Sequence, residues 1–236
     1  MIKEITKEGL PEVLRTSYDN WEQIFKDKMK NTILNSLAWQ GEDKNLRAFN
    51  SKEDFIEWYC YHPSEAESYR DDGFYPRELT FLSDYVKPNF IIELGTSLGM
   101  GTFMLSMLNP DAVLYTVDNK DMQYLPGYIK VSTGYISRLN NVYCQYINGE
   151  SYKTKIPEKF HLCFIDADHS GETVWKDTLW AWANKSNKYA IIWHDYRVDN
   201  SEFDGLIESI KKFSTITDIY KLKDSSTVWT VGGIDG

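Results

Sequence analysis

The chain has 236 residues and a formal charge of −9 at neutral pH, with 26 Lys and Arg against 35 Asp and Glu. Apolar residues make up 42% and aromatic residues 15% of the sequence, so a substantial core can form and disorder is not expected. The acidic balance argues against a general nucleic-acid-binding surface and against an anionic-membrane surface. We therefore expect neither nucleic acid nor a membrane as a partner.

The N-terminal sequence MIKEITKEGLPEV lacks the apolar core of a signal peptide, and no apolar stretch approaches the length of a membrane span. The three cysteines, Cys60, Cys144 and Cys163, lack the spacing of metal ligands. Cys144 and Cys163 lie in apolar strand-like runs, where a cysteine is usually a small core residue. These features predict a cytoplasmic protein in a reducing compartment, and a homo-oligomer remains open.

Residues 1–75 are predicted to form a helical N-terminal extension. Glu12 to Ala38 carries apolar residues at helical intervals, Gln40 to Asn45 resembles a loop, and Ser51 begins a capping-box-like signal before an aromatic run. The aromatic residues of this segment have two interpretations, a helical layer packed on a sheet or a cap over a substrate pocket. The cap would include His62, Tyr69 and Tyr75.

Residues 76–236 alternate between apolar strands and helices, which is typical of a doubly wound, mostly parallel α/β sheet. The seven predicted strands are Phe90 to Ile92, Ala112 to Asp118, Val142 to Ile147, Phe160 to Asp166, Tyr189 to Trp193, Thr217 to Leu222 and Thr227 to Val231. The predicted helices are Arg77 to Val86, Thr102 to Leu108, Glu172 to Ala183 and Phe203 to Phe213. Tyr128 to Leu139 is ambiguous, with a helix around Gly134 as one alternative.

The segment Asn89 to Leu105, NFIIELGTSLGMGTFML, organises this second part of the chain. An apolar strand leads into a turn that contains Gly95, Gly99 and Gly101, and a helix follows. Glycines allow a close approach of the backbone to a ligand, and the N–H groups at a helix start are donors. The pattern predicts a nucleotide-like ligand, although a tight connection between strand and helix without a ligand would look similar.

The acidic residue before the first glycine, followed by x-Gly-x-x-x-Gly, resembles the S-adenosylmethionine-binding motif of class I methyltransferases. The resemblance implies the Rossmann-like fold of that family, with seven strands of which the last is antiparallel. It also implies that Glu93 answers the cationic amino-acid end of the cofactor. The turn residues that would surround the cofactor are Gly95, Thr96, Ser97 and Gly99.

Acidic residues also follow the next two strands. Asp118, with Asn119 after it, is placed to accept hydrogen bonds from the two ribose hydroxyls, although a nicotinamide cofactor would use an acid there too. Glu150 and Ser151 resemble the methyltransferase segment in which a side chain reaches the adenine amine. A solvated acid at Asp118 and an ordinary turn at Glu150 are the simpler alternatives.

Two later strand ends carry the most specific motif. Asp166-Ala167-Asp168-His169 resembles the Asp-Ala-Asp-Lys or Asp-Gly-Asp-His sequence of small-molecule O-methyltransferases, many of which use a divalent cation. The resemblance implies that Asp166 contributes to the cofactor site and binds the metal, together with His194 and Asp195. Adjacent parallel strands lie about 4.8 Å apart, so Asp166 and Asp195 can converge on one ion.

Two departures from the family pattern leave alternatives open. His169 replaces the lysine base of the catechol-type and caffeoyl-type enzymes, whereas Asp168 matches the base proposed for antibiotic-sugar methyltransferases. His194 stands where relatives carry a carboxylate or an amide, and imidazole is an unusual ligand for magnesium. Either a transition metal replaces magnesium, or His194 is itself an acid or base and no metal is present.

These features predict an S-adenosylmethionine-dependent methyltransferase that acts on a hydroxyl of a small-molecule acceptor, such as a sugar or a secondary metabolite. One alternative is a related sheet that is used for hydroxylation. Another is a non-catalytic module that binds a nucleoside or a partner protein. The glycine spacing and Glu93 disfavour a nicotinamide enzyme.

Overall fold

The computed structural model describes residues 1–32, 38–40, 46–48, 51, 76–125, 129–223 and 225–233. The predicted aromatic cap, with His62, Tyr69 and Tyr75, lies outside the described residues, as does Cys60. Of the predicted loop, only Gln40 is described, and it ends a short strand.

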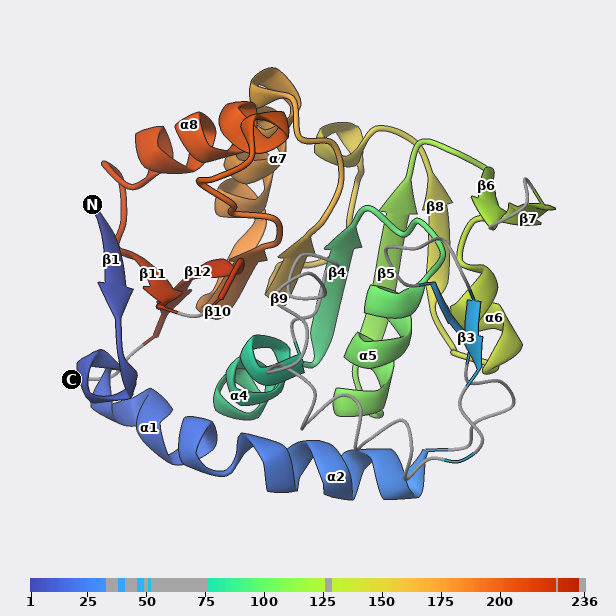
Figure 1. Cartoon of the computed structure of the whole chain (residues 1–236), viewed down its shortest axis with the longest axis horizontal. Helices are drawn as coiled ribbons and strands as arrows, with labels where there is room; N and C mark the ends of the chain where they lie inside the picture. Colours follow the sequence, from blue (N-terminus) through green and yellow to red (C-terminus); the bar gives the residue numbers. More distant parts are fainter. Residues whose placement is uncertain are drawn as a thin grey trace.

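The fold centres on one mostly parallel sheet, and the strands of this sheet that the structure describes number eight, in the order β1-β11-β12-β10-β9-β4-β5-β8 (Figure 1). They are β1 (Ile2–Ile5), β4 (Phe90–Leu94), β5 (Val113–Asp118), β8 (Gln145–Asn148), β9 (Phe160–Ile165), β10 (Lys185–Trp193), β11 (Ile219–Leu222) and β12 (Val228–Gly232). Strand β12 is antiparallel to both of its neighbours, and the other neighbouring pairs are parallel. The predicted seven-stranded α/β fold, with an antiparallel last strand, is confirmed.

An eighth strand, β1, was missed. It pairs with β11 in parallel at the edge of the sheet, with Ile2 opposite Ile219. Its two terminal isoleucines are half-buried, and Lys3 and Glu4 between them are exposed. A short edge strand with two polar residues lacks the apolar run that distinguishes the central strands, so its pattern is a weak signal for a strand.

The helices cover both faces of the sheet. The described helices are α1 (Glu12–Asp19), α2 (Trp21–Asn31), α4 (Pro76–Val86), α5 (Met100–Leu108), α6 (Tyr135–Leu139), α7 (Gly171–Asn184) and α8 (Asp204–Phe213). Each face of the sheet has its own hydrophobic core, because successive side chains of a strand point to opposite faces. In β4, Ile91 belongs to the core with α1, α2, α4 and α5, and Ile92 belongs to the core with α7 and α8. In Figure 1, α4 and α5 lie in front of the central strands, and α1 and α2 run along one end.

The predicted helical stretch from Glu12 to Ala38 is divided. Asn20 separates α1 from α2, and its side-chain amide donates to the Thr16 carbonyl oxygen at 2.8 Å. The stretch is wrong at its end, because Ala38 belongs to the short strand β2 (Ala38–Gln40), which pairs with β3 (Leu46–Ala48). Periodicity alone could not place these ends, since local side-chain hydrogen bonds compete with the helix.

The ambiguous segment, Tyr128 to Leu139, contains the second strand of a hairpin and a short helix, and the first strand of the hairpin precedes it. Strands β6 (Met122–Leu125) and β7 (Ile129–Ser132) pair in antiparallel fashion, and α6 then begins after Gly134. Short 3-10 turns lie at Ser151–Lys153, between β8 and β9, and at Ser201–Phe203, directly before α8. The first turn, η1, follows β1 at Lys7–Gly9.

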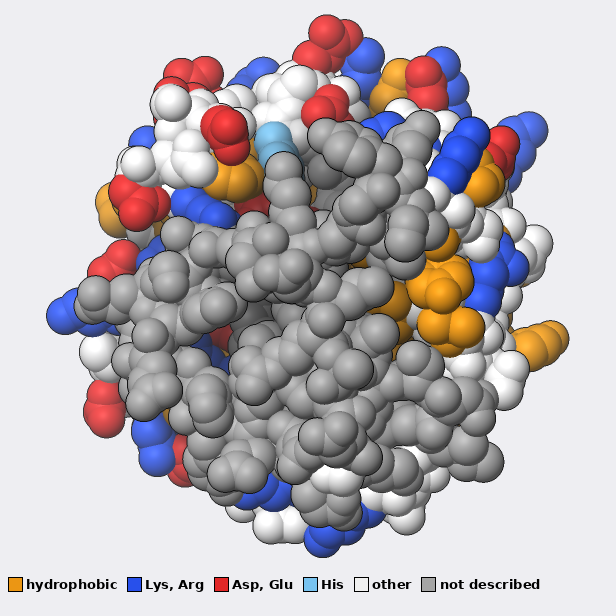
Figure 2. All heavy atoms as spheres, turned by 45° about the vertical axis from the view of Figure 1, so that its right-hand side comes forward, with side chains coloured by type: hydrophobic (Ala, Val, Ile, Leu, Met, Phe, Trp, Pro, Cys, Tyr) orange, Lys and Arg blue, Asp and Glu red, His pale blue; other side chains and the backbone are white. Residues whose placement is uncertain are grey.

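Charged side chains of both signs are interspersed over the described part of the face in Figure 2, and hydrophobic side chains gather at its right. Some of the charges pair at the surface, as Lys3 does with Asp218 at 2.7 Å. Within the described residues, no helix has the length and apolar character needed to cross a membrane.

The strand ends position the candidate site. Leu94 of β4 lies between Val117 of β5 and Ile165 of β9, and Ile165 in turn pairs with Trp193 of β10. The backbone bonding continues one residue further, since the Asp166 N–H donates to the Leu94 carbonyl at 2.8 Å. The residues that follow the four strands therefore meet at one edge, as expected for parallel strands.

Candidate active site

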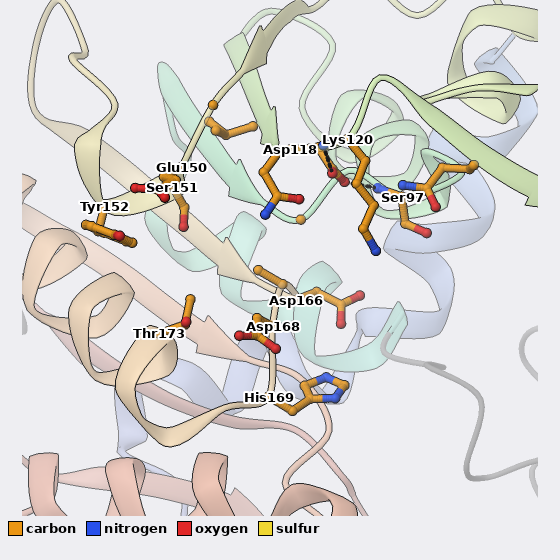
Figure 3. Close-up of a pocket in the computed structure, with 16 residues that line it drawn as sticks. Ser97, Asp118, Lys120, Glu150, Ser151, Tyr152, Asp166, Asp168, His169 and Thr173 are labelled. Carbon is orange, nitrogen blue, oxygen red and sulfur yellow. Dashed lines mark hydrogen bonds between the residues drawn. The ribbon is translucent and has the colours of Figure 1, made fainter.

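A pocket of about 650 Å³ opens at this edge of the sheet, within the range of roughly 300–1,000 Å³ that is usual for small-molecule sites. Figure 3 shows Ser97, Asp118 and Lys120 on one side, Ser151, Tyr152 and Thr173 on another, and Asp166, Asp168 and His169 below. The predicted site residues that line it are Gly95, Ser97, Asp118, Asn119, Glu150, Ser151, Asp166, Asp168 and His169. Residues that follow four separate strands of the sheet thus share one cavity.

Gly95 is required by the close approach of two strand ends. Its φ is +99°, and a Cβ atom there would lie 1.9 Å from the carbonyl oxygen of Asp166. Gly99 also has a positive φ, of +89°, but an added Cβ would meet the Ser137 hydroxyl and the Gly134 backbone rather than the pocket. The geometry explains Gly99 by the packing of α5 against α6, so its contact with a cofactor stays a prediction.

The Asp118 carboxylate is fixed at the pocket wall by two backbone donors. The Ser97 N–H donates to Oδ2 at 2.8 Å and the Lys120 N–H to Oδ1 at 2.9 Å. Ser97 has a φ of +45°, an uncommon conformation for a residue with a side chain. Each carboxylate oxygen retains a lone pair, so Asp118 can accept hydrogen bonds from two neighbouring hydroxyls.

Glu93 lies apart from the described residues that line the pocket and is 1% exposed. Its Oε2 accepts hydrogen bonds from the hydroxyls of Thr102 and Thr116, the second at 2.5 Å, and Thr96 bonds to Thr116 at 2.5 Å. Burial raises the pKa of Glu93 to about 8, and the two threonine bonds only partly oppose this shift. Glu93 and Thr96 thus anchor the glycine turn from inside the protein, and their contact with a cofactor stays a prediction.

The segment after β8 brings Glu150 and Ser151 to the pocket. Glu150 forms an exposed ion pair with Lys153, and the hydrogen bond from Lys153 lowers the pKa of the Glu150 carboxyl. The Ser151 hydroxyl donates instead to Asp177, a fully buried carboxylate of α7. Ser151 is therefore held by the protein, whereas Glu150 is turned toward solvent.

Two histidines and two carboxylates form a cluster below the pocket. His194 Nδ1 lies 3.2 Å from Asp166 Oδ1 and 3.3 Å from Asp195 Oδ2, and His169 Nε2 lies 3.1 Å from the same Asp195 oxygen. Arg197 Nη2 holds the other Asp195 oxygen at 3.0 Å. Asp195 is 9% exposed and has a φ of +60°, so the backbone carries strain where three donors converge.

The charges of this cluster are paired within the protein. Burial disfavours the charged form of His194, but Asp166 and Asp195 outweigh it and raise the pKa of His194 to about 10. Burial likewise opposes ionisation of Asp195, yet His194, His169 and Arg197 hold the pKa of its carboxyl well below the ordinary value. His194 is therefore a protonated partner of two carboxylates at neutral pH.

Asp168, the second predicted proton acceptor, is occupied locally. Its Oδ2 accepts a hydrogen bond from the Ser170 hydroxyl at 2.5 Å, and this bond lowers the pKa of the Asp168 carboxyl. Ser170 stands at the N-terminal cap of α7, so Asp168 contributes to the start of that helix. A carboxylate with a lowered pKa is a weak base.

The cluster also contains a set of ligand atoms suited to a cation. One ligand atom from each of Asp166, His169 and Asp195 lies within 4.8 Å of the others. Two carboxylates and an imidazole suit manganese, iron or zinc better than magnesium. The predicted set named His194 where the structure brings His169 into the group, because His194 faces the carboxylates from the buried side.

Several residues of the site were missed by sequence reasoning. Lys120, Tyr152 and Thr173 line the pocket, and Arg197 and Asp177 hold site residues from behind. Arg197 lies two residues after Asp195, a proximity that could have signalled it. Asp177 gave no signal, because it lies far along the chain from Ser151 and inside an ordinary helical pattern.

Comparisons with known proteins agree with this picture. Residues 92–196 match a family model described as a methyltransferase domain, which extends from β4 to just beyond β10. No curated protein sequence matches the chain.

Two solved O-methyltransferase structures share the fold, and a third aligns less closely. CalS11, a TDP-rhamnose 3′-O-methyltransferase of calicheamicin biosynthesis, aligns with a TM-score of 0.51 at 13% identity, over 66% of this chain and 77% of that one. The O-methyltransferase NovP aligns with a TM-score of 0.50 at 16% identity, over 67% and 81%. An O-methyltransferase from Bacillus cereus in complex with SAH aligns with a TM-score of 0.48 at 17% identity, over 66% and 79%.

At these identities the solved structures show the fold alone. The family match covers the glycine turn, the Asp118 strand end and both late strand-end motifs. Together with the observed strand order, it confirms the resemblance recognised in the sequence. Residues 92–196 match the model of a methyltransferase domain, and the described sheet has the mostly parallel order and the antiparallel last strand that the resemblance implied.

Proposed function

We propose that the chain transfers a methyl group from S-adenosylmethionine to a hydroxyl of a small molecule, such as a sugar or a secondary metabolite. The observation that carries this proposal is a single pocket that joins the Asp118 carboxylate, the Gly95 turn and the His169 imidazole. Asp118 and the Gly95 turn would hold the nucleoside part of the cofactor, and His169 would accept the proton of the acceptor hydroxyl. The sugar acceptor of CalS11 agrees with this acceptor class.

The cofactor side of the pocket is the wall formed by the glycine turn and Asp118. Asp118 accepts hydrogen bonds from the ribose hydroxyls, since the Ser97 and Lys120 N–H groups hold its carboxylate in place. Ser151 lies on the opposite wall of the pocket, where we place the adenine base of the cofactor. When bound, S-adenosylmethionine supplies an electrophilic methyl group on a sulfonium sulfur.

The proton acceptor in this proposal is His169. Its Nε2 is held by Asp195 at 3.1 Å, and its ring packs against Phe203 with 4.7 Å between the ring centroids. An imidazole whose one nitrogen is oriented by a buried carboxylate, and which lines a pocket, has the arrangement of a general base. Asp168 is the weaker candidate because its carboxylate is engaged by Ser170. His194, buried and protonated, holds Asp166 and Asp195 in position.

A divalent cation is a separate part of the proposal. Asp166, His169 and Asp195 would hold it, and its chemistry would be to lower the pKa of the acceptor hydroxyl. The cation is an alternative to His169 as the proton acceptor, because an imidazole that ligates a metal has no lone pair left to accept a proton. His194 and Arg197 already neutralise the two carboxylates, so the site is charge-balanced by the protein's own residues. Turnover should therefore be compared with and without a chelator, and unchanged turnover would remove the cation from the proposal.

Isothermal titration with S-adenosylhomocysteine tests the cofactor. Binding should be measurable and should weaken by about ten-fold or more in Asp118→Ala, because ribose loses its charged acceptor. Absence of binding at millimolar concentration would contradict the proposal.

A methyl-transfer assay over a panel of sugars, sugar nucleotides and phenols tests the reaction. With an accepted substrate, His169→Gln should lower kcat by about a hundred-fold or more. His161→Gln makes the same change in β9, outside the residues that line the pocket, and serves as the matched control. Equal effects of the two variants would exclude His169 as the base.

A further inference from the structure

The contact between Ser151 and Asp177 lies behind the wall of the pocket. Ser151 lines the cavity on the side of Tyr152 and Thr173 (Figure 3). Asp177 belongs to α7, is fully buried, and accepts the Ser151 hydroxyl hydrogen through Oδ1. The backbone N–H of Tyr152 also faces this carboxylate. Both of these groups are donors, and the second carboxylate oxygen, Oδ2, is buried without a hydrogen-bond partner among the described residues.

The direction of this hydrogen bond limits what Ser151 can offer to a ligand. A serine hydroxyl has one hydrogen and two lone pairs, whereas an ionised carboxylate can only accept. Because the hydrogen is committed to Asp177, the hydroxyl retains only acceptor capacity for a ligand in the pocket. It can pair with an N–H group but not with a carbonyl oxygen.

We infer that Asp177 is a positioning residue, which fixes the Ser151 hydroxyl as an acceptor and so makes the pocket select a base that carries an amino group over one that carries a carbonyl. The inference rests on the proposed function, because it takes the ligand on this wall to be the base of a nucleoside. It adds a determinant of specificity that does not itself touch the ligand. A carbonyl at the same place would set two acceptors against each other, and a buried polar mismatch of this kind is costly.

The protonation state of Asp177 sets the conditions of the test. Burial raises the pKa of Asp177 to about 6, and the hydrogen bond from Ser151 opposes this shift. Asp168 contributes a further charge that favours the neutral form, and Cys163 is the other titratable group that interacts with Asp177. Measurements near pH 8 keep the carboxylate ionised.

The experiment is a comparison of two ligands by isothermal titration to the full chain near pH 8. The ligands are S-adenosylhomocysteine and S-inosylhomocysteine, in which a carbonyl replaces the amino group of the base. The wild-type chain should bind the adenine compound at least about ten-fold more tightly. Asp177→Asn should reduce this ratio to within about three-fold, because an amide can donate to Ser151 and release its hydrogen toward the ligand.

The chain contains a matched control pair. Ser17 donates to Asp84 at 2.5 Å between α1 and α4, away from the residues that line the pocket. Asp84→Asn makes the same chemical change in a serine–aspartate pair and should leave the ratio of the two affinities as in the wild type. A purely structural role of Asp177 would weaken both ligands alike and leave the ratio unchanged.

The variants of Ser151 keep the inference testable if Asp177→Asn does not fold. Ser151→Ala should lose about ten-fold in affinity for the adenine compound and little for the inosine compound, and Ser151→Thr should restore the discrimination. A wild-type ratio near one, or a ratio that Asp177→Asn or Ser151→Ala leaves intact, would overturn the inference while the proposed function stands. Failure of both ligands to bind the wild type would overturn the proposed function itself.

Discussion

Two buried carboxylates at the same edge of the sheet have opposite electrostatic behaviour. Glu93, in β4, is 1% exposed and is bonded by the hydroxyls of Thr102 and Thr116. Asp195, just past β10, is 9% exposed and is contacted by His169, His194 and Arg197. The pKa of Glu93 is raised to about 8, whereas the pKa of Asp195 is held well below its ordinary value.

The difference shows that burial alone does not decide whether an acid is charged. Burial raises the pKa of both carboxyls, and only at Asp195 do cationic partners reverse the shift. Neutral hydroxyls leave Glu93 protonated at neutral pH, as a structural link between β4, β5 and α5. Asp195 stays ionised and can orient the His169 imidazole. The row of acids at the strand ends therefore contains two kinds of group.

The largest expected loss of unfolding free energy comes from removing Asp195, the ionised carboxylate of the two. Asp195→Ala leaves Arg197 and His194 without their shared carboxylate, and breaking a buried ion pair in this way costs about 3–5 kcal/mol of unfolding free energy. Denaturant unfolding near neutral pH measures it. Asp199→Ala, at an exposed aspartate in the same loop, is the control and should change stability little. A loss of unfolding free energy in Asp195→Ala no larger than in Asp199→Ala would show that the ion pairs of Asp195 do not stabilise the fold.

Glu93, the protonated carboxyl of the two, should make the free energy of unfolding depend on pH, with a sign that follows from its pKa. Because the pKa of Glu93 in the folded state, about 8, exceeds the ordinary value of 4.5, the folded state binds this proton more tightly than the unfolded chain. Stability from Glu93 is therefore greatest below about pH 4.5, declines by about 3 kcal/mol between pH 4.5 and pH 7, and continues to fall as pH passes through 8.

Unfolding of Glu93→Gln as a function of pH checks this sign. The variant cannot ionise, so it should lack this decline and be more stable than the wild type near pH 9. Asp177, with its pKa raised to about 6, contributes a smaller decline of the same sign in both proteins. Identical pH slopes for wild type and variant would contradict the assignment of Glu93 as a buried neutral acid.

A smaller effect is expected from the donors of Glu93. Thr116→Val removes one hydroxyl that favours the ionised form, so the pKa of Glu93 should rise further. The loss of unfolding free energy should be about 1 kcal/mol near pH 6 and larger near pH 9, where the carboxylate is less well stabilised. An equal loss at both pH values would mean that Thr116 acts through packing alone.

The smallest effect is expected where an ion pair is exposed. The side chains of Lys3 and Asp218 are 44% and 54% exposed, and their pair lies at the edge between β1 and β11. Asp218→Asn should cost less than about 1 kcal/mol and should cost still less in high salt. A loss of unfolding free energy as large as that of Asp195→Ala would show that burial does not explain the difference between this ion pair and those of Asp195.

Much of the fold follows from the sequence of residues 76–236. The apolar runs of β4 and β9 and residues 189–193 of β10 are buried on both faces, β5 is buried in part, and the turn and helix signals between these strands are strong, so the parallel sheet was predictable. The same argument placed Asp118, Asp166 and the His194–Asp195 pair at one edge. It failed for β1, whose polar edge residues carry no such signal, and for the division between α1 and α2.

What the sequence determined by itself is the order of strands and helices and the kind of residue at each strand end, because periodicity and turn chemistry are local properties of the chain. Only the tertiary structure decided the state and partners of those residues. It placed Glu93 among threonines, Asp195 among cations and Ser151 against Asp177, contacts between segments far apart in the sequence. Burial and the charge of neighbouring groups set protonation and hydrogen-bond direction, and both are properties of the folded packing.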